Sequence, residues 1–164
     1  MLKPNSLRAF LTDSNAFLKA DPDRLLMFVD EGRIVASGTL ALSHEYRYTL
    51  NLIVTDYPGA EDALLLPLLA WLRTNQPELF ENPELRDNAI PFDVDLNNNQ
   101  TVDISIKVSL TERVIVSYDD TAQRVNVAHV PEPVHPALPD QGERRPVYLN
   151  DRQIATMPFP VGNP

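Results

Sequence analysis

The longest unbroken alternation of apolar residues in this chain lies between residues 102 and 118. Every second residue of this segment is apolar, with Glu112 as the exception. A period of two is typical of a β-strand with one buried face. Fully extended, the segment would span about 56 Å, well beyond the usual strand of a globular protein. We therefore expect this strand either to bend near residues 111–113 or to project beyond its sheet.

Other segments share the strand pattern. Residues 42–56 alternate between an apolar and a polar face, which predicts a half-buried strand. Residues 92–96 are expected to form a hairpin with the long strand across the turn at 97–100. Residues 124–130 are expected to form a second hairpin with its far end, so the long strand is predicted to be shared by two hairpins.

Two further hairpins are predicted from turn residues. In residues 25–36 two apolar runs flank Asp30-Glu31-Gly32, an acidic turn closed by glycine. Residues 147–155 read as a small hairpin around Asn150-Asp151. A hairpin of that size is not stable alone, so we expect it to dock on another surface.

Two helices complete the expected fold. Residues 4–19 have apolar residues at helical spacing, and Pro22 disfavours continuation of the helix. Residues 60–75 are apolar on nearly all faces, and Pro67 should bend or restart that helix. Residues 76–91 are expected to form a surface loop. The predicted class is α+β: a mostly antiparallel sheet with two packed helices and long β-hairpins.

Proline and charge divide the chain unevenly. Eight of the 15 prolines lie in the last 34 residues, whereas residues 1–130 carry a net charge of −8 of the total −9. We therefore expect an α+β body over 1–130 and an extended, proline-rich C-terminal arm with a small hairpin over 131–164. The arm is expected to reach a neighbouring molecule.

Composition excludes several classes of protein. The chain has no cysteine, so it has neither disulfides nor thiolate metal sites. No apolar run approaches the roughly 20 residues of a membrane span. A sequence pI near 4.7 argues against nucleic-acid binding as the main task.

No pattern of catalytic or metal-binding residues is present. The chain lacks GxSxG, Walker and GxGxxG motifs, and His44, His129 and His135 lack metal-ligand spacing. The segment that starts at Asp93 resembles a calcium loop, but its sixth position is Asn98 and its twelfth is Ile104 instead of glycine and glutamate. We expect no enzyme activity, no cofactor and no metal.

Several segments, in order, resemble a known family. They are MLKPNSLRAFLTD, YRYTLNLIVTDYPG, LLLPLLAWLRTNQPEL, DVDLNNNQTVDISIKVSLTERV and the terminal VYLNDRQIA. In sequence and spacing they resemble the R-type tail completion proteins of temperate contractile-tailed phages. The resemblance is collinear over about residues 1–116, with a fainter echo at 147–155.

The resemblance implies a tail-terminator-like virion protein of the tail or neck, assembled in the cytoplasm of the bacterial host. Such a protein would form a ring, expected to be a hexamer, that caps the tail tube and sheath at the head-proximal end and offers a docking surface to the head connector. It would bind no specific nucleic acid, although DNA would pass through the ring. The acidic body suits such a channel, because like charge suppresses phosphate binding; plain solubility explains the acidity equally well.

The expected contacts with other copies and with partners lie on the projecting hairpin and on the arm. The residues are Leu110, Glu112, Arg113, Tyr118, Val125, Val127, Tyr148, Leu149 and Ile154. Two other roles stay open within the same setting: a head–tail connector stopper, and an assembly chaperone absent from the virion. A small hydrolase is the alternative from another class.

Overall fold

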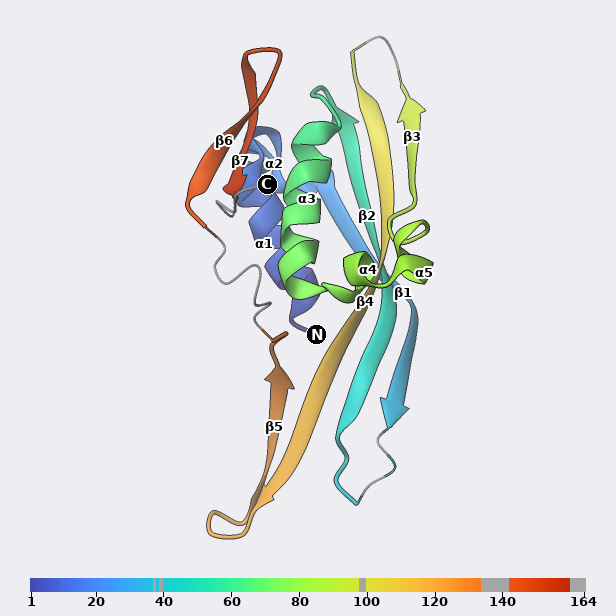
Figure 1. Ribbon diagram of the computed structural model, residues 1–164, viewed down its shortest axis with the longest axis vertical. Coiled ribbons are helices and arrows are strands. Elements are labelled where there is room, and N and C mark those ends of the chain that lie inside the picture. Colours follow the sequence, from blue (N-terminus) through green and yellow to red (C-terminus); the bar gives the residue numbers. More distant parts are fainter. Residues whose placement is uncertain (37, 39, 98–99, 134–141, 160–164) are drawn as a thin grey trace.

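A computed structural model describes residues 1–36, 38, 40–97, 100–133 and 142–159 of the chain (Figure 1). The helices are α1 (Lys3–Ser14), α2 (Ala16–Ala20), the 3-10 helix η1 (Pro22–Arg24), α3 (Asp62–Asn75), α4 (Glu78–Glu81) and α5 (Pro83–Arg86). The strands are β1 (Leu25–Ala36), β2 (His44–Tyr57), β3 (Phe92–Leu96), β4 (Val102–Asp119), β5 (Arg124–Val130), β6 (Arg144–Leu149) and β7 (Arg152–Pro158).

Five strands form one antiparallel sheet around β4. The order is β1-β2-β4-β3, and β5 pairs with the far end of β4. Leu52 of β2 lies opposite Met27 on one side and Ile106 on the other, so the apolar parities of the strands share a face. We call this the inner face, because α1 and α3 cover its upper half in Figure 1. The predicted α+β class is confirmed.

The long strand projects beyond its sheet. β2 pairs with β4 only as far as His44, opposite Val114. β5 pairs with β4 from Arg113 to Asp119, so beyond Val114 β5 is the one described strand that pairs with β4. Figure 1 shows these two strands leaving the body as a separate hairpin. The predicted projection is confirmed, and we call the paired residues 115–119 and 124–128 the projecting hairpin.

The core lies between the inner face and the two longer helices. Leu7 and Leu11 of α1 and Leu68 and Leu72 of α3 are buried against the sheet. The sheet contributes a larger set of buried apolar side chains. They are Leu25, Tyr48, Leu50, Leu52, Val54, Ile104, Ile106, Val108 and Leu110.

The first predicted helix is in fact two helices, α1 and α2, separated at Asn15. Asn15 has an extended backbone, and its Oδ1 caps α2 by accepting hydrogen bonds from the N–H groups of Phe17 and Leu18. Its Nδ2 donates to the carbonyl of Ala63 at 3.2 Å. That carbonyl would otherwise bond the N–H of residue 67, which is Pro67. Asn15 therefore satisfies the acceptor that the proline leaves free, and α3 continues through Pro67.

The hairpin predicted over residues 25–36 is wrong. β1 is one continuous strand along β2, with a bulge between Asp30 and Arg33, where Glu31 has a φ of +52°. An acidic turn closed by Gly32 has the same composition as such a bulge. The bulge changes which parity faces inward, from Leu25 and Met27 before it to Ile34 after it.

The surface loop predicted over residues 76–91 contains two short helices, α4 and α5, and buries Leu79. This segment covers the edge of β4 between its pairings with β3 and β5. The amide of Lys107 donates to the carbonyl of Pro91, and the amide of Thr111 donates to Gln76 Oε1. An otherwise open strand edge is thereby closed within the chain.

The predicted terminal hairpin forms from β6 and β7, with Asn150 and Asp151 both at positive φ, as a type I′ turn requires. β7 packs against α3 and α1, and Ala155 and Met157 are buried there. Arg144 of β6 forms an ion pair with Asp13 of α1 at 2.8 Å. The hairpin thus docks on its own chain; the role of the arm toward a neighbour stays a prediction, and residues 134–141 of the arm lie outside the described residues. No described helix has the length and apolar character needed to cross a membrane.

Candidate assembly surface

The projecting hairpin exposes apolar side chains on its inner face. Tyr118 lies opposite Val125, and Val116 lies opposite Val127, so these four side chains share one face. Tyr118, Val125 and Val127 are 56%, 61% and 63% exposed. None of the helices that the structure describes lies over this face of the two-stranded ribbon (Figure 1). Adjacent exposed apolar side chains on a ribbon are typical of a surface that another protein covers.

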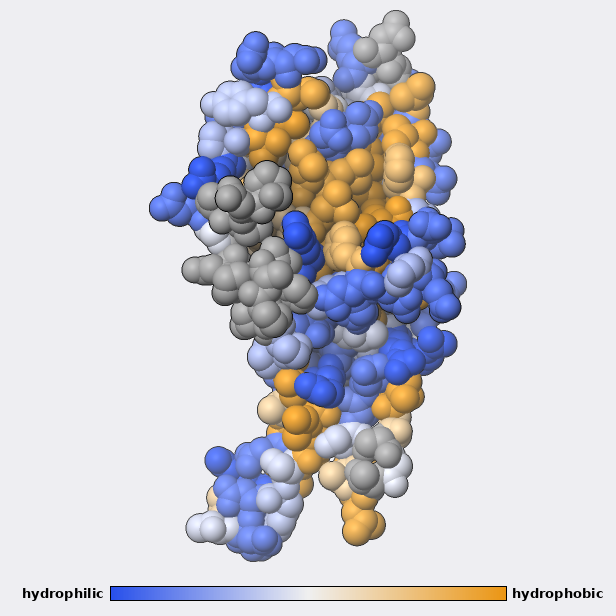
Figure 2. Space-filling model, in the orientation of Figure 1, coloured by the Kyte–Doolittle hydropathy of each residue, from blue (hydrophilic) through white to orange (hydrophobic). Residues whose placement is uncertain are grey.

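A second projection lies beside the hairpin and is also apolar. It consists of the ends of β1 and β2 and the described part of their connection, with Ile34, Leu40 and Leu42 strongly exposed. Ser43 holds it to β4, since its Oγ accepts a hydrogen bond from the amide of Val116 at 3.0 Å. Figure 2 shows apolar colour on both projections, below a hydrophilic band that crosses the middle of the molecule, whereas the tip of the hairpin is hydrophilic.

Glu112 lies at the root of the projecting hairpin and explains the break in the apolar pattern of β4. Its side chain is buried and accepts hydrogen bonds from the amide of Leu2 at 2.6 Å, the amide of Lys3 at 3.3 Å and the hydroxyl of Tyr48 at 2.6 Å. These amides belong to the N-terminal end of α1, where a negative charge is favourable. The root of the hairpin is therefore fixed to the first helix.

The electrostatics at this root follow from the same contacts. Burial by itself raises the pKa of Glu112, but the hydrogen bonds from Leu2, Tyr48 and Lys3 outweigh it and hold the pKa below its ordinary value. Burial, together with the hydrogen bond to this carboxylate, raises the pKa of Tyr48. Glu112 is therefore ionised and Tyr48 is neutral at pH 7.

The contacts of two further side chains, Lys3 and His129, stabilise the same region. Lys3 Nζ pairs with Glu132 at 2.8 Å and donates to Gln76 Oε1 at 2.7 Å. His129 of β5 stacks on Tyr46, and its Nδ1 lies 3.3 Å from Glu112. The N-terminus, the edge-covering segment and both strands of the hairpin thus meet at one point.

The predicted contact residues separate into three groups. Leu110 and Glu112 are buried, so neither presents a surface to another molecule. Tyr118, Val125 and Val127 come together on the projecting hairpin, and the exposed Arg113 lies near its root on the opposite face of β4. The third group is Tyr148, Leu149 and Ile154 of the terminal hairpin; the first two are exposed near its turn, and Ile154 is partly buried.

The structure does not bring the two hairpins together, because their tips lie at opposite ends of the molecule (Figure 1). The sequence patterns did not indicate the exposed Ile34, Leu40 and Leu42. Exposure of Ile34 was predictable in principle, since apolar residues at the end of an edge strand are exposed. It was missed because residues 25–36 were predicted to form a hairpin instead of one strand.

Neither a metal centre nor a catalytic group emerges from the described residues. No group of three or more His, Asp or Glu side chains among them is placed to hold a metal ion. Asp93 and Asp95, from the segment that resembles a calcium loop, lie on β3. Asn98 and Asn99 of that segment, and His135, fall outside the described residues. The surface, not a site of chemistry, is the candidate functional feature.

Comparison with known proteins gives one family. The family model described as P2 phage tail completion protein R matches residues 1–133. The chain is 48% identical over 157 residues to the tail completion protein R of Escherichia phage P2. The matched region covers 94% of this chain and 97% of that protein. No solved structure matches the chain.

Proposed function

Since the chain belongs to the P2 phage tail completion protein R family, we propose that it caps the head-proximal end of the tail tube and sheath as a closed ring and offers a docking surface to the head connector. The family itself consists of structural tail completion proteins of contractile-tailed phages, not of enzymes. The chain therefore belongs in the virion tail, where it contacts other tail components.

The observation that carries the proposal is the exposed apolar face of the projecting hairpin. A tail completion protein acts through contacts with its neighbours, and Tyr118, Val125 and Val127 form an apolar ribbon outside the body. Contacts between different patches of identical subunits close into a ring when the rotation between neighbours divides a full turn. A cap on a tube with rotational symmetry requires such closure.

The root of the hairpin supports the same role. The bonds of Glu112 to Leu2, Lys3 and Tyr48 fix the ribbon before any partner binds. A preformed surface loses less conformational freedom on association than a flexible one. A subunit that must be added once, at the end of tail assembly, gains from such preorganisation.

The test is complementation of a phage that lacks this gene. Without the chain, we expect tails that do not join heads; supplied from a plasmid and carrying a small tag, the chain should restore joining. Gold label against the tag should lie at the head-proximal end of purified tails. Label on heads alone would indicate a connector stopper, and absence from purified virions would indicate an assembly chaperone; either result contradicts the proposal.

A further inference from the structure

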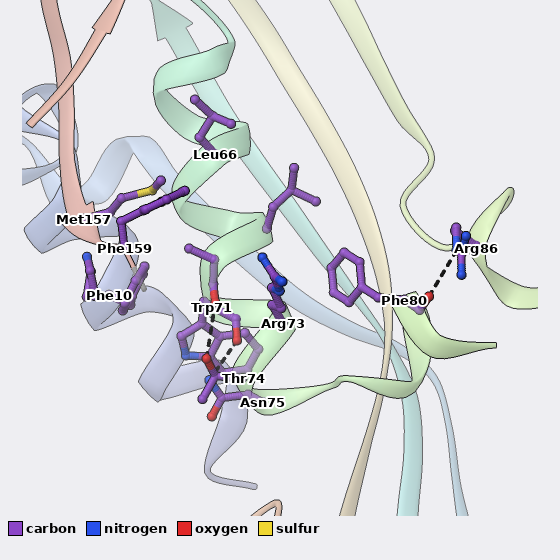
Figure 3. Close-up of a pocket in the computed structure, with 13 residues that line it drawn as sticks. Phe10, Leu66, Trp71, Arg73, Thr74, Asn75, Phe80, Arg86, Met157 and Phe159 are labelled. Carbon is purple, nitrogen blue, oxygen red and sulfur yellow. Dashed lines mark hydrogen bonds between the residues drawn. The ribbon is translucent and has the colours of Figure 1, made fainter. Parts of the chain in front are cut away.

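An apolar groove of about 490 Å³ lies on the upper half of the molecule, beside α3 (Figure 3). Its volume lies in the range of sites that bind small molecules or a few side chains of a partner. Side chains from α1, α3, the segment after α3 and the end of β7 line it. The apolar ones include Phe10, Leu69, Trp71, Phe80, Met157 and Phe159.

The charge of the groove is opposite to that of the chain. Two arginines, Arg73 and Arg86, contribute to its wall, and none of the described residues that line it is acidic. The chain as a whole carries 23 acidic and 14 basic side chains. Arg86 Nε donates to the carbonyl of Phe80, whereas Arg73 has no hydrogen bond or ion pair among the described residues. Figure 3 shows Arg73 on α3, between the side of the groove at Phe159 and the side at Phe80.

An occupant that fits this groove has apolar side chains and a negative end. The projecting hairpin has both properties. Its inner face carries Tyr118, Val125 and Val127, and its tip carries Asp119, Asp120 and, opposite Asp119, Arg124, so that the tip is acidic by one charge. The hairpin leaves the lower end of the molecule, whereas α3, which lines the groove, lies in the upper half, so the two do not meet within one molecule (Figure 1).

We propose that the groove beside α3 receives the projecting hairpin of a second copy of this chain, with the acidic turn directed at Arg73 and Arg86. This proposal rests on the proposed function, since it names the contact by which copies join. The contact is heterologous: each copy uses its hairpin once and its groove once. Such a contact closes a ring when the rotation between neighbours divides a full turn, and otherwise extends without limit.

Charged substitutions on each partner test the contact, with a matched control beside each. Val125→Glu alters the hairpin face, and Ile115→Glu alters the opposite face of the same hairpin, where Ile115 is 46% exposed. Leu69→Glu alters the groove, and Leu26→Glu alters a leucine of similar exposure on β1 outside it. Oligomer size is measured by light scattering against concentration, and folding by circular dichroism.

Val125→Glu and Leu69→Glu should each weaken association at least about tenfold, because a charge replaces an apolar side chain that the proposed contact buries. The two controls should change it less than about twofold. An equimolar mixture of the two interface variants should form 1:1 dimers and nothing larger, since one intact hairpin and one intact groove remain per pair.

A charge exchange gives an independent readout. Arg73→Glu and Asp120→Arg should each weaken association at low salt by about threefold, and the double variant should recover it. Asp120 is chosen because Asp119 caps the turn through the amides of Thr121 and Ala122. A double variant no better than either single variant contradicts the placement of the turn against the arginines.

Three results overturn the proposal: an unsubstituted chain that is monomeric at about 1 mM, interface variants that associate as the unsubstituted chain does, or a mixture that gives no dimer. Rings that persist in Val125→Glu overturn this contact but leave the proposed capping function standing. Normal association together with no rescue of head joining contradicts the capping function and leaves this contact standing.

Discussion

Glu112 makes a contribution to stability that depends on pH. Its pKa is lower in the folded chain than its ordinary value of 4.5, so its stabilisation is fully present above that value and is lost as the pH falls through the folded pKa. Glu112→Gln should therefore lower the free energy of unfolding by about 1–3 kcal/mol at pH 7. Urea unfolding of both chains from pH 7 to pH 3 measures the difference, which should shrink on acidification. A difference that is constant with pH would contradict an ionised Glu112.

The contribution of Asn15 to the free energy of unfolding depends on Pro67, which is 52 positions away in the sequence. Asn15→Asp keeps the acceptor that caps α2 but places a carboxylate against the carbonyl of Ala63, which Pro67 leaves without a helical partner. We expect a loss of about 1–3 kcal/mol in the free energy of unfolding. In a Pro67→Ala background the backbone N–H of residue 67 can donate to the carbonyl of Ala63, so the loss should be smaller. A double-mutant cycle measures this coupling, and equal losses in both backgrounds would exclude it.

At the scale of elements, the segment 76–91 protects the edge of β4. Gln76 is buried and exchanges hydrogen bonds with Thr111, accepting from its amide and donating to its hydroxyl. Gln76→Ala should speed hydrogen exchange at the Thr111 amide by about tenfold or more relative to that of Leu110, whose amide points to the opposite side of the strand. Equal acceleration at both amides would indicate global destabilisation instead of an opened edge.

Which elements could be predicted depended on whether one period covers the whole element. The parity of β4 held over its full length, so both the strand and its projection were predictable. In β1 the bulge at Glu31 changes the inward parity, and a local pattern cannot distinguish that change from a turn. The helices α4 and α5 are four residues each, too short to show a helical period.

The candidate surface divides in the same way. The hairpin face was predictable because Tyr118, Val125 and Val127 are close in the sequence, and each lies on the apolar parity of its own strand. The role of Glu112 was not, because its partners Leu2 and Tyr48 lie far away in the sequence. The groove was missed for the same reason: Phe10, Trp71 and Phe159 meet only in the folded chain.

At the scale of the whole molecule, the terminal hairpin has two properties, and deletion of residues 131–164 would remove both at once. One side of it covers the helices through the buried Met157, while its turn exposes Tyr148. Met157→Ala should therefore lower the free energy of unfolding by about 2–5 kcal/mol. Tyr148→Ala should change it by less than about 0.5 kcal/mol.

If the arm binds a partner, Tyr148→Ala, which barely changes stability, should have the larger effect on head joining. Tyr148→Ala should reduce head joining in the complementation assay although the chain is as stable as the unsubstituted one. Met157→Ala should reduce joining only at temperatures that approach its lowered melting point, where about 2–4 °C are lost per kcal/mol for a chain of this size. Normal joining by Tyr148→Ala would mean that the exposed turn contacts no partner, and that the terminal hairpin acts only by covering α1 and α3.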